Sequence, residues 1–181
     1  MNGNAVVTIN NVTAGTIAGD QTICSGSSTA AFSSNADGAG NGTVTYRWEI
    51  NTNMTTPSWS TISGATGNIY NPGTLTADAQ YRRVTINTLN NVACEAISNV
   101  LTVTVNNVTA GTIAGDQTIC SGSSTAAFSS NADGAGNGTI TYRWEINTNM
   151  TTPSWSTISG ATGNIYNPGT LTADAQYRRV T

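Results

Sequence analysis

Two nearly identical copies of one sequence make up most of this chain, and the repeat constrains the fold more than any other feature. Residues 11–85 and 107–181 agree at every position except one, where Val44 becomes Ile140, so the offset is 96 residues. A fixed period of this size predicts an array of similar folded units. Tandem copies suit a stalk, a spacer or a multivalent binder, because each copy adds length or a binding site. A catalytic site gains little from duplication.

The repeat also sets the expected domain boundaries. Residues 5–10 stand where Leu101–Asn106 stand one period later, so we expect residues 1–10 to be the last strand of a preceding repeat. Residues 11–106 then form a complete repeat, and residues 107–181 form a second repeat that stops before its last strand. We expect the second repeat to take that strand from elsewhere. The donor is a continuing chain or, in this chain alone, residues 5–10 of another molecule.

Composition excludes several classes of function. Charged residues make up 8% of the chain, the net charge is −3, and there is neither His nor Lys. A surface without clustered basic residues predicts no nucleic-acid partner. The absence of a long apolar run predicts no direct insertion into a membrane. Without His or Lys, the usual nucleophile–base pairs cannot form, so we expect no enzyme activity, no catalytic residues and no cofactor.

The acidic residues are too dispersed to predict acid–base catalysis or a metal site. A calcium ion requires several carboxylates in one place, and zinc requires a His/Cys cluster. We therefore expect no metal ligands, and we expect Glu49 to lie on a solvent-facing side of its strand. The carboxylates of one repeat are Asp20, Asp37, Glu49, Asp78 and Glu95.

Alternating residues predict strands throughout the repeat. In residues 43–50, Val44, Tyr46, Trp48 and Ile50 are predicted to share one face. Clusters of Gly, Asn, Ser and Pro separate the strands at intervals of about 8 to 12 residues, which is typical of a β-sandwich. The other expected strands are 13–17, 21–24, 29–33, 58–62, 68–70, 80–87 and 101–105.

Two positions favour an immunoglobulin-like version of the sandwich. Trp48 lies in mid-strand after Cys24, where the third strand of such folds carries its core tryptophan. Tyr81 opens a late strand, as in a tyrosine corner, but Arg83 stands where antibody domains have a core cysteine. We expect the Arg83 stem to lie across Trp48. The fold predicted is all-β, with tandem immunoglobulin-like β-sandwich repeats arranged end to end.

The aromatic residues are interpreted mainly as core. Packing in the interior is the usual role of mid-strand aromatic side chains. Trp59 and its copy Trp155 are the candidates for partial exposure, and so for a binding surface that holds glycans. The expected core residues are Trp48, Tyr81, Trp144 and Tyr177.

Several segments together resemble a known type of repeat. They are residues 15–26 (GTIAGDQTICSG), 43–48 (TVTYRW), 62–66 (ISGAT) and 81–84 (YRRV), with a late Cys94. They resemble the immunoglobulin-like repeats of very large secreted surface proteins of Bacteroidota, including gliding-motility adhesins of the SprB type. The resemblance covers essentially the whole repeat, and it implies an extracellular, cell-surface location reached by a route such as type IX secretion.

The resulting functional hypothesis is a structural stalk or filament repeat of a surface adhesin, projecting a binding tip and resisting mechanical load. Its partners would be neighbouring repeats of the same chain, and surface glycans or other cell-surface proteins. Two alternatives stay open: a glycan- or surface-binding module acting by multivalency, and a spacer repeat of a secreted enzyme. An exposed Trp59 favours binding, whereas a buried one favours the stalk.

Cysteines at matching positions suggest disulfides in an oxidising compartment. Each complete repeat has an early and a late cysteine, here Cys24 and Cys94, and the second copy has Cys120. One pairing joins Cys24 to Cys94 within a repeat. The other joins the early cysteine of one repeat to the late cysteine of the next, because immunoglobulin topology places the two at opposite ends of a sandwich.

Overall fold

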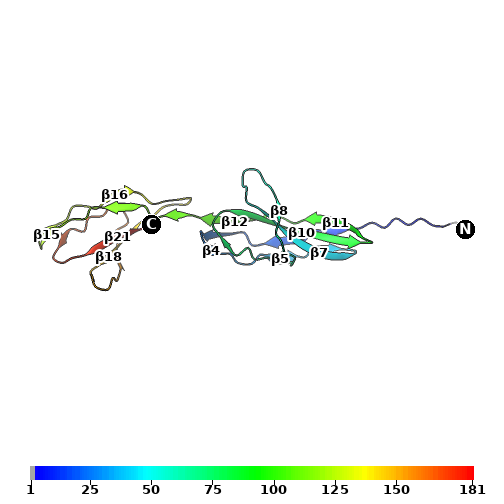
Figure 1. The fold of residues 1–181 in the computed structure, drawn as a ribbon, viewed down its shortest axis with the longest axis horizontal. Helices are drawn as coiled ribbons and strands as arrows, with labels where there is room; N and C mark the ends of the chain where they lie inside the picture. Colours follow the sequence, from blue (N-terminus) through cyan, green and yellow to red (C-terminus); the bar gives the residue numbers. More distant parts are fainter. Residues whose placement is uncertain (1–2) are drawn as a thin grey trace. The chain divides into compact units, whose positions relative to one another are not determined.

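The computed structural model describes residues 3–181, so the first two residues of the expected preceding strand, 1–10, lie outside the described part. The described chain is all-β and contains no helix. It divides into two units, Met1–Val105 and Asn106–Thr181. Several small sheets surround a larger one in unit 1, which is consistent with a β-sandwich (Figure 1).

The strands of unit 1 are short except for β7, β10, β11 and β12. Their bounds are β1 (Val12–Thr13), β2 (Thr16–Ala18), β3 (Gln21–Cys24), β4 (Ser27–Ser28), β5 (Ser33–Ala36), β6 (Ala39–Gly40), β7 (Thr43–Asn51), β8 (Ser60–Thr61), β9 (Thr74–Leu75), β10 (Ala79–Leu89), β11 (Val92–Ile97) and β12 (Leu101–Asn106).

The main sheet of unit 1 has the order β3-β12-β10-β7-β8. β10 pairs with β7 in antiparallel register from Gln80 opposite Asn51 to Thr88 opposite Thr43. The other edge of β10 is shared. Its first residues pair with β12 and its last six pair with β11, so β11 and β12 follow one another along the same side of β10.

The second layer consists of three two-stranded sheets, β1-β6, β2-β5 and β4-β9, together with a bridge between Phe32 and Tyr70. The core lies between this layer and the main sheet. Phe32, Trp48 and Tyr81 are almost completely buried, and the half-buried Tyr70 packs against them. The Phe32 ring centroid is 5.8 Å from that of Trp48 and 5.1 Å from that of Tyr81. Large aromatic side chains of this kind dominate the energetics of a core.

The predicted face of β7 is confirmed by the register. Trp48 lies opposite Arg83 and Ile50 lies opposite Tyr81, on the side that faces the core. The longest strand that was not predicted is β11, which forms a hairpin with the end of β10; the two-residue strands β4, β6 and β9 were not predicted either. Asn90 and Asn91, with φ of 50° and 63°, make the tight turn. Two residues at positive φ are typical of a type I′ hairpin turn, and Asn tolerates that conformation best among residues with a side chain.

Unit 2 repeats the second layer and only part of the main sheet. Its strands are β13 (Val108–Thr109), β14 (Thr112–Ala114), β15 (Ser123–Ser124), β16 (Ser129–Ala132), β17 (Ala135–Gly136), β18 (Arg143–Asn147), β19 (Ser156–Thr157), β20 (Thr170–Leu171) and β21 (Gln176–Val180). The three strands β19-β18-β21 form the largest sheet of this unit.

Candidate functional site

The expected core residues differ between the two units. Trp48 and Trp144 both have no exposed surface, and each indole Nε1 donates a hydrogen bond of 2.9 Å to a backbone carbonyl, of Gly67 and Gly163 respectively. Tyr81 is 1% exposed, whereas Tyr177, expected in the core, is only half-buried. The core is therefore closed around the tryptophan of each unit but not around the tyrosine of unit 2.

Trp59 is neither buried nor freely exposed. It is half-buried, and the guanidinium of Arg82 lies 4.2 Å from its ring centroid, a cation–π contact. Trp155 has the same state, with Arg178 at 4.4 Å. One face of each indole is thus already occupied by an arginine of the same unit.

Sequence reasoning missed the buried role of Arg83. The side chain is fully buried, with its guanidinium 4.8 Å from the Tyr46 ring centroid rather than over Trp48. It donates to the carbonyls of Asn68 at 2.7 Å and Ala36 at 2.9 Å, and to the Ser34 hydroxyl at 2.8 Å. These acceptors belong to the opposite layer, so Arg83 connects the two layers where antibody domains have a disulfide.

Glu49 lies on the face of β7 opposite Trp48, as expected, but it is not exposed to solvent. It is 7% exposed because Arg47 and Arg82 form ion pairs with it, at 3.0 and 2.7 Å. Arg47 also pairs with Glu95 of β11, and hydrogen bonding to that carboxylate raises the pKa of Arg47 and lowers that of Glu95. The outer face of the main sheet is therefore held by a charge network between β7, β10 and β11.

The expected disulfides are not formed, and all three cysteines are free. Cys94 lies opposite Asn87, near one end of β10. Cys24 ends β3, which lies beside β12 at the other end. The two are more than roughly 25 Å apart along the sheet, whereas a disulfide requires Cα atoms within about 7 Å. Pairing within one repeat is thus wrong, and pairing with a following repeat stays a prediction.

No cluster of three or more potential metal ligands is found among residues 3–181. In the same range, no helix is long and apolar enough to cross a membrane.

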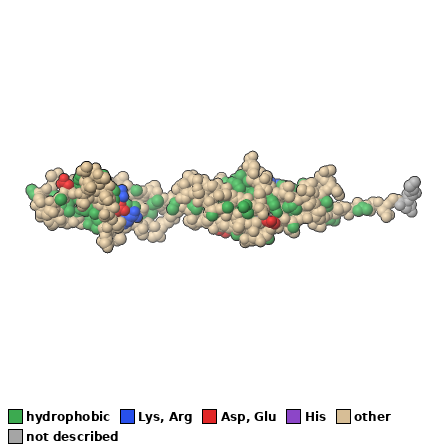
Figure 2. Space-filling view, turned by 90° about the horizontal axis from the view of Figure 1, so that it is seen from below, with side chains coloured by type: hydrophobic (Ala, Val, Ile, Leu, Met, Phe, Trp, Pro, Cys, Tyr) green, Lys and Arg blue, Asp and Glu red, His purple; other side chains and the backbone are tan. Residues whose placement is uncertain are grey.

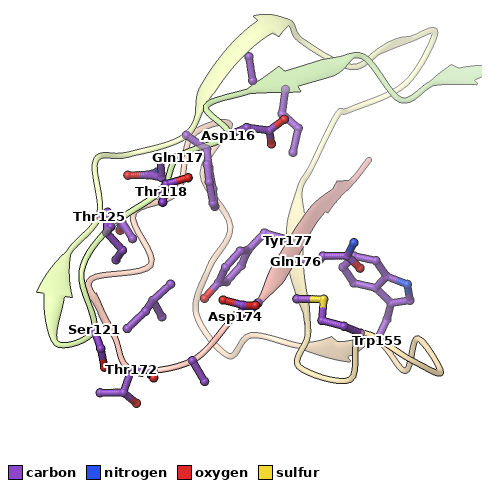
Figure 3. A pocket seen from close by; sticks show the side chains of 18 residues that line it. Asp116, Gln117, Thr118, Ser121, Thr125, Trp155, Thr172, Asp174, Gln176 and Tyr177 are labelled. Carbon is purple, nitrogen blue, oxygen red and sulfur yellow. Dashed lines mark hydrogen bonds between the residues drawn. The ribbon is translucent and has the colours of Figure 1, made fainter.

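A groove of about 850 Å³ lies in unit 2 (Figure 3). It runs between residues 113–121 on one side and residues 171–177 on the other. The side chains of Gln117, Thr118, Asp174 and Tyr177 point into it. Residues that would normally form a hydrophobic core line its floor, including Ile113, Phe128, Leu171 and Ala175.

In unit 1 the corresponding residues enclose β12. Leu101, Val103 and Val105 of that strand are at most 2% exposed. Ala79 and Tyr81, the counterparts of Ala175 and Tyr177, lie directly opposite Val103 and Leu101. Ile17, Phe32 and Ala79 are buried in unit 1, whereas their counterparts Ile113, Phe128 and Ala175 are half-exposed. The groove of unit 2 therefore has the shape of an absent strand.

Two carboxylates lie beside the position that β12 occupies, one near each end. In unit 1, Asp20 accepts a hydrogen bond from the backbone N–H of Thr102 at 2.6 Å, and Asp78 accepts one from Val105 at 2.7 Å. Their counterparts, Asp116 and Asp174, line the groove, are exposed, and carry no hydrogen bond from any described residue. Both ends of the groove thus present an acceptor suited to a backbone N–H.

A comparison with family models shows that both units belong to one protein family. The model described as Domain of unknown function (DUF8696) matches residues 13–107 and, a second time, residues 109–181. The chain belongs to this family. Each unit of the structure therefore corresponds to one DUF8696 match, the second lacking the strand that completes the first. A comparison with curated proteins finds no match.

The segment before the first DUF8696 match is the other unpartnered feature. Residues 3–10 form no strand, and the side chains of Val6, Val7 and Ile9 are 83%, 85% and 65% exposed. Figure 1 shows this segment as an extended trace, and Figure 2 shows it as a thin stretch of chain with hydrophobic atoms at its surface. The segment is fixed to unit 1 by Asn10, whose side-chain amide donates to the carbonyls of Asn87 and Val92 at 3.0 and 2.7 Å.

Proposed function

We propose that the DUF8696 repeat is a structural, non-enzymatic unit of an extracellular stalk or filament, with immunoglobulin-like sandwiches placed end to end on a bacterial surface. The stalk projects a binding tip and resists mechanical load. The immunoglobulin-like assignment is supported by the strand order β3-β12-β10-β7-β8, with the buried Trp48 on the inner strand β7. The surface location is supported by the sequence resemblance alone.

The proposed resistance to mechanical load rests on one observation. The first and last strands of the main sheet in chain order, β3 and β12, run in the same direction. Asn99 holds Ile17 through two hydrogen bonds of 2.9 and 2.8 Å, and Asp20 holds Thr102. Contacts therefore advance together along both segments, so β3 and β12, which are neighbours in the sheet, are parallel.

Parallel strands change how a pulling force acts. A force on the two ends of the unit acts through β1 and β2 on β3, and draws the segment that ends in β3 past β12 along its length. All hydrogen bonds between them are then strained together, instead of breaking one after another as in peeling. Only Asn107 separates β12 from β13, so each added repeat adds a folded unit and almost no free linker.

The test is single-molecule stretching of the chain, following the unfolding of unit 1. Asn99→Ala removes the two hydrogen bonds to Ile17 and should lower the unfolding force clearly. Asn71→Ala is the matched control, because it removes hydrogen bonds to Thr29 and Gly73 in the other layer. It should lower equilibrium stability with little effect on the force. Equal effects of the two variants would contradict the load-bearing role.

The location is tested separately by labelling intact cells of the source with an antibody against the repeat. Labelling without permeabilisation is expected. Signal restricted to permeabilised cells would contradict a surface stalk.

A further inference from the structure

We propose that two molecules pair side by side along the free edge of β11, and that a disulfide between their Cys94 residues then joins the pair. The proposal goes beyond a stalk of single chains, because it gives the repeat a lateral partner, a second copy of itself. It rests on the backbone of β11 inside unit 1. It depends neither on surface location nor on resistance to force.

The pairing of β11 with β10 shows which backbone groups of β11 are used. Val92 lies opposite Leu89 across the two-residue turn, and the N–H of Ser98 donates to the Arg83 carbonyl at 2.9 Å. Hydrogen bonding alternates along an antiparallel pair, so every second residue of β11 directs its N–H and C=O to β10. Between Val92 and Ser98, these residues are Cys94 and Ala96.

The intervening residues of β11 present a free edge. Ala93, Glu95 and Ile97 direct their backbone groups away from β10, and all three residues are exposed. β11 pairs with no strand other than β10 in the described chain, and no described residue bonds to the backbone of these three. Unpaired N–H and C=O groups in a row are a template for another strand.

This edge lacks the features that usually protect an open strand. Such edges are often blunted by charged side chains, by proline or by very short strands. β11 has six residues, no proline and one charged residue, Glu95. Arg47 of β7 binds that carboxylate at 2.7 Å and so holds it over its own sheet. Val92 and Ile97 are 58% and 52% exposed, which adds apolar surface to the edge.

A second copy of β11 fits the edge in one register. In a two-fold antiparallel pair, one residue lies opposite its own copy, and the two longest overlaps are centred on Cys94 and on Glu95. Centring on Glu95 sets two carboxylates directly opposite each other, which is destabilising. Centring on Cys94 sets Glu95 opposite Ala93, and each such pair exchanges both backbone hydrogen bonds. The exposed Val92 then lies opposite Ala96 of the second copy.

The same register brings the two Cys94 residues together. Because Cys94 directs its backbone to β10, it meets its copy as a non-hydrogen-bonded pair, with Cα atoms about 4.5 Å apart. A disulfide requires roughly 4.4–6.8 Å, and Cys94 is free and half-buried. Two short strands bury little compared with the roughly 1,600 Å² of a standard interface, so we expect a weak contact until the disulfide forms.

The linking step is a thiol–disulfide exchange with a small-molecule disulfide as the oxidant. One Cys94 thiolate attacks the small disulfide, forms a mixed disulfide and releases one small thiol. The Cys94 thiolate of the second copy then displaces the second small thiol. Two protein thiols are oxidised to one disulfide, and one small disulfide is reduced to two thiols. This use of Cys94 is an alternative to a disulfide between successive repeats.

The first experiment oxidises full-length chains that each keep one cysteine, in buffers of oxidised and reduced glutathione. Cys24→Ser with Cys120→Ser keeps Cys94 and should give a linked dimer that reductant reverses. Cys94→Ser with Cys120→Ser keeps Cys24, which is more exposed. We expect Cys94 to link at least about 10-fold faster than Cys24, because pairing of β11 raises the effective concentration of its thiols.

Proline substitution in the Cys94 chain then tests the edge itself. Ala93→Pro replaces an edge N–H by a ring and should slow linking by more than about 10-fold. Ile97→Pro is the matched control on the same edge. Ile97 lies opposite the turn residue Asn91 in the proposed register and opposite Ala93 in the rejected one, so its substitution should have a much smaller effect. Far-ultraviolet circular dichroism shows whether each variant is folded.

A mixing experiment measures the register without proline. In chains that carry Cys94→Ser, Cys24→Ser and Cys120→Ser, one variant has Val92→Cys and the other has Ala96→Cys. Each variant alone should link poorly to itself. The mixture should link at least about 10-fold faster, because only Val92 and Ala96 lie opposite each other.

Three results would overturn the proposal. The first is a Cys24 chain that links as fast as the Cys94 chain. The second is equal slowing by Ala93→Pro and Ile97→Pro when both are folded. The third is a mixture of the Val92→Cys and Ala96→Cys variants that links no faster than either one alone. The unfolding force of unit 1 enters none of these measurements, so lateral pairing and the proposed stalk function can fail separately.

Discussion

Tyr81 and Tyr177 lie in identical stretches of sequence, yet Tyr81 is buried and Tyr177 is half-exposed. The substitution of Val44 by Ile140 does not explain the difference, because Val44 lies opposite Asn87, whereas Tyr81 lies between Ile50 of β7 and Leu101 of β12. Leu101 covers Tyr81, and no described residue takes that place beside Tyr177. The burial of a core residue in this fold thus depends on a strand that lies outside the shared sequence.

The same comparison explains one missing and one shortened strand in unit 2. Residues 117–120 repeat β3 letter for letter but form no strand, because β3 pairs with β12. β18 begins at Arg143, whereas β7 begins at Thr43, because the second half of β10 that pairs with the start of β7 has no counterpart in unit 2. Strand assignment here follows the hydrogen-bond partner and not local propensity.

The largest expected effect comes from completing unit 2. A chain extended after Thr181 by a copy of residues 86–107 supplies three apolar side chains equivalent to Leu101, Val103 and Val105. Their burial should stabilise unit 2 by about 5 to 8 kcal/mol. Calorimetry is expected to show two transitions in the original chain that converge after the extension. Two unchanged transitions would mean that the missing strand is not responsible for the difference.

The next largest effect is a loss of stability on removing the core tryptophan, and it should be the same in both units. Trp48→Ala and Trp144→Ala each remove a fully buried indole and should cost about 3–5 kcal/mol. The surroundings are alike, with Phe32 and Phe128 both at 5.8 Å between ring centroids. Denaturant unfolding of each variant gives the measurement. A loss below about 1 kcal/mol at either site would show that the tryptophan is not part of a packed core.

A smaller difference should appear in alkaline solution. Burial raises the pKa of Tyr81 to about 12, with a second contribution from Tyr70, and burial also raises the pKa of Tyr177. A raised pKa favours the neutral phenol in the folded state. The stability from Tyr81 is therefore complete below pH 10 and lost as the pH rises towards 12. Spectrophotometric titration of Tyr81→Phe and Tyr177→Phe should show that Tyr81 of unit 1 has a higher pKa than Tyr177 of unit 2.

The smallest expected difference lies at Asp37 and Asp133. Hydrogen bonds from Ser34 and Asn68 lower the pKa of Asp37, and Ser130 and Asn164 lower that of Asp133 in the same way. Both carboxylates therefore favour the folded state at neutral pH, and this contribution is lost as the pH falls through their lowered pKa values. NMR titration should find both pKa values below that of a free Asp and close to each other. A clear difference between the two pKa values would show that the open groove also disturbs the second layer of unit 2.

Prediction from sequence succeeded where a residue's environment is local. The all-β class, the inward face of β7 and the buried tryptophans follow from alternation and turn residues. β11 was missed although its signal, Asn90-Asn91 between apolar residues, is a recognisable hairpin turn. The burial of Glu49 was missed because Arg82 of β10 becomes a neighbour of its carboxylate only through the sheet register, whereas Arg47 follows from the alternation of β7 itself.

By itself the sequence determined the repeat, the all-β class and the residues that alternate into a core. Tertiary structure alone decided which of those residues are covered. Pairing of β3 and β10 with β12, the insertion of Arg83 between layers, and the distance between Cys24 and Cys94 are contacts between segments far apart along the chain. The alternation of apolar and polar residues shows which side of a strand is apolar, but it does not show which other strand lies next to it. For that reason two nearly identical sequences form one closed core in unit 1 and one open groove in unit 2.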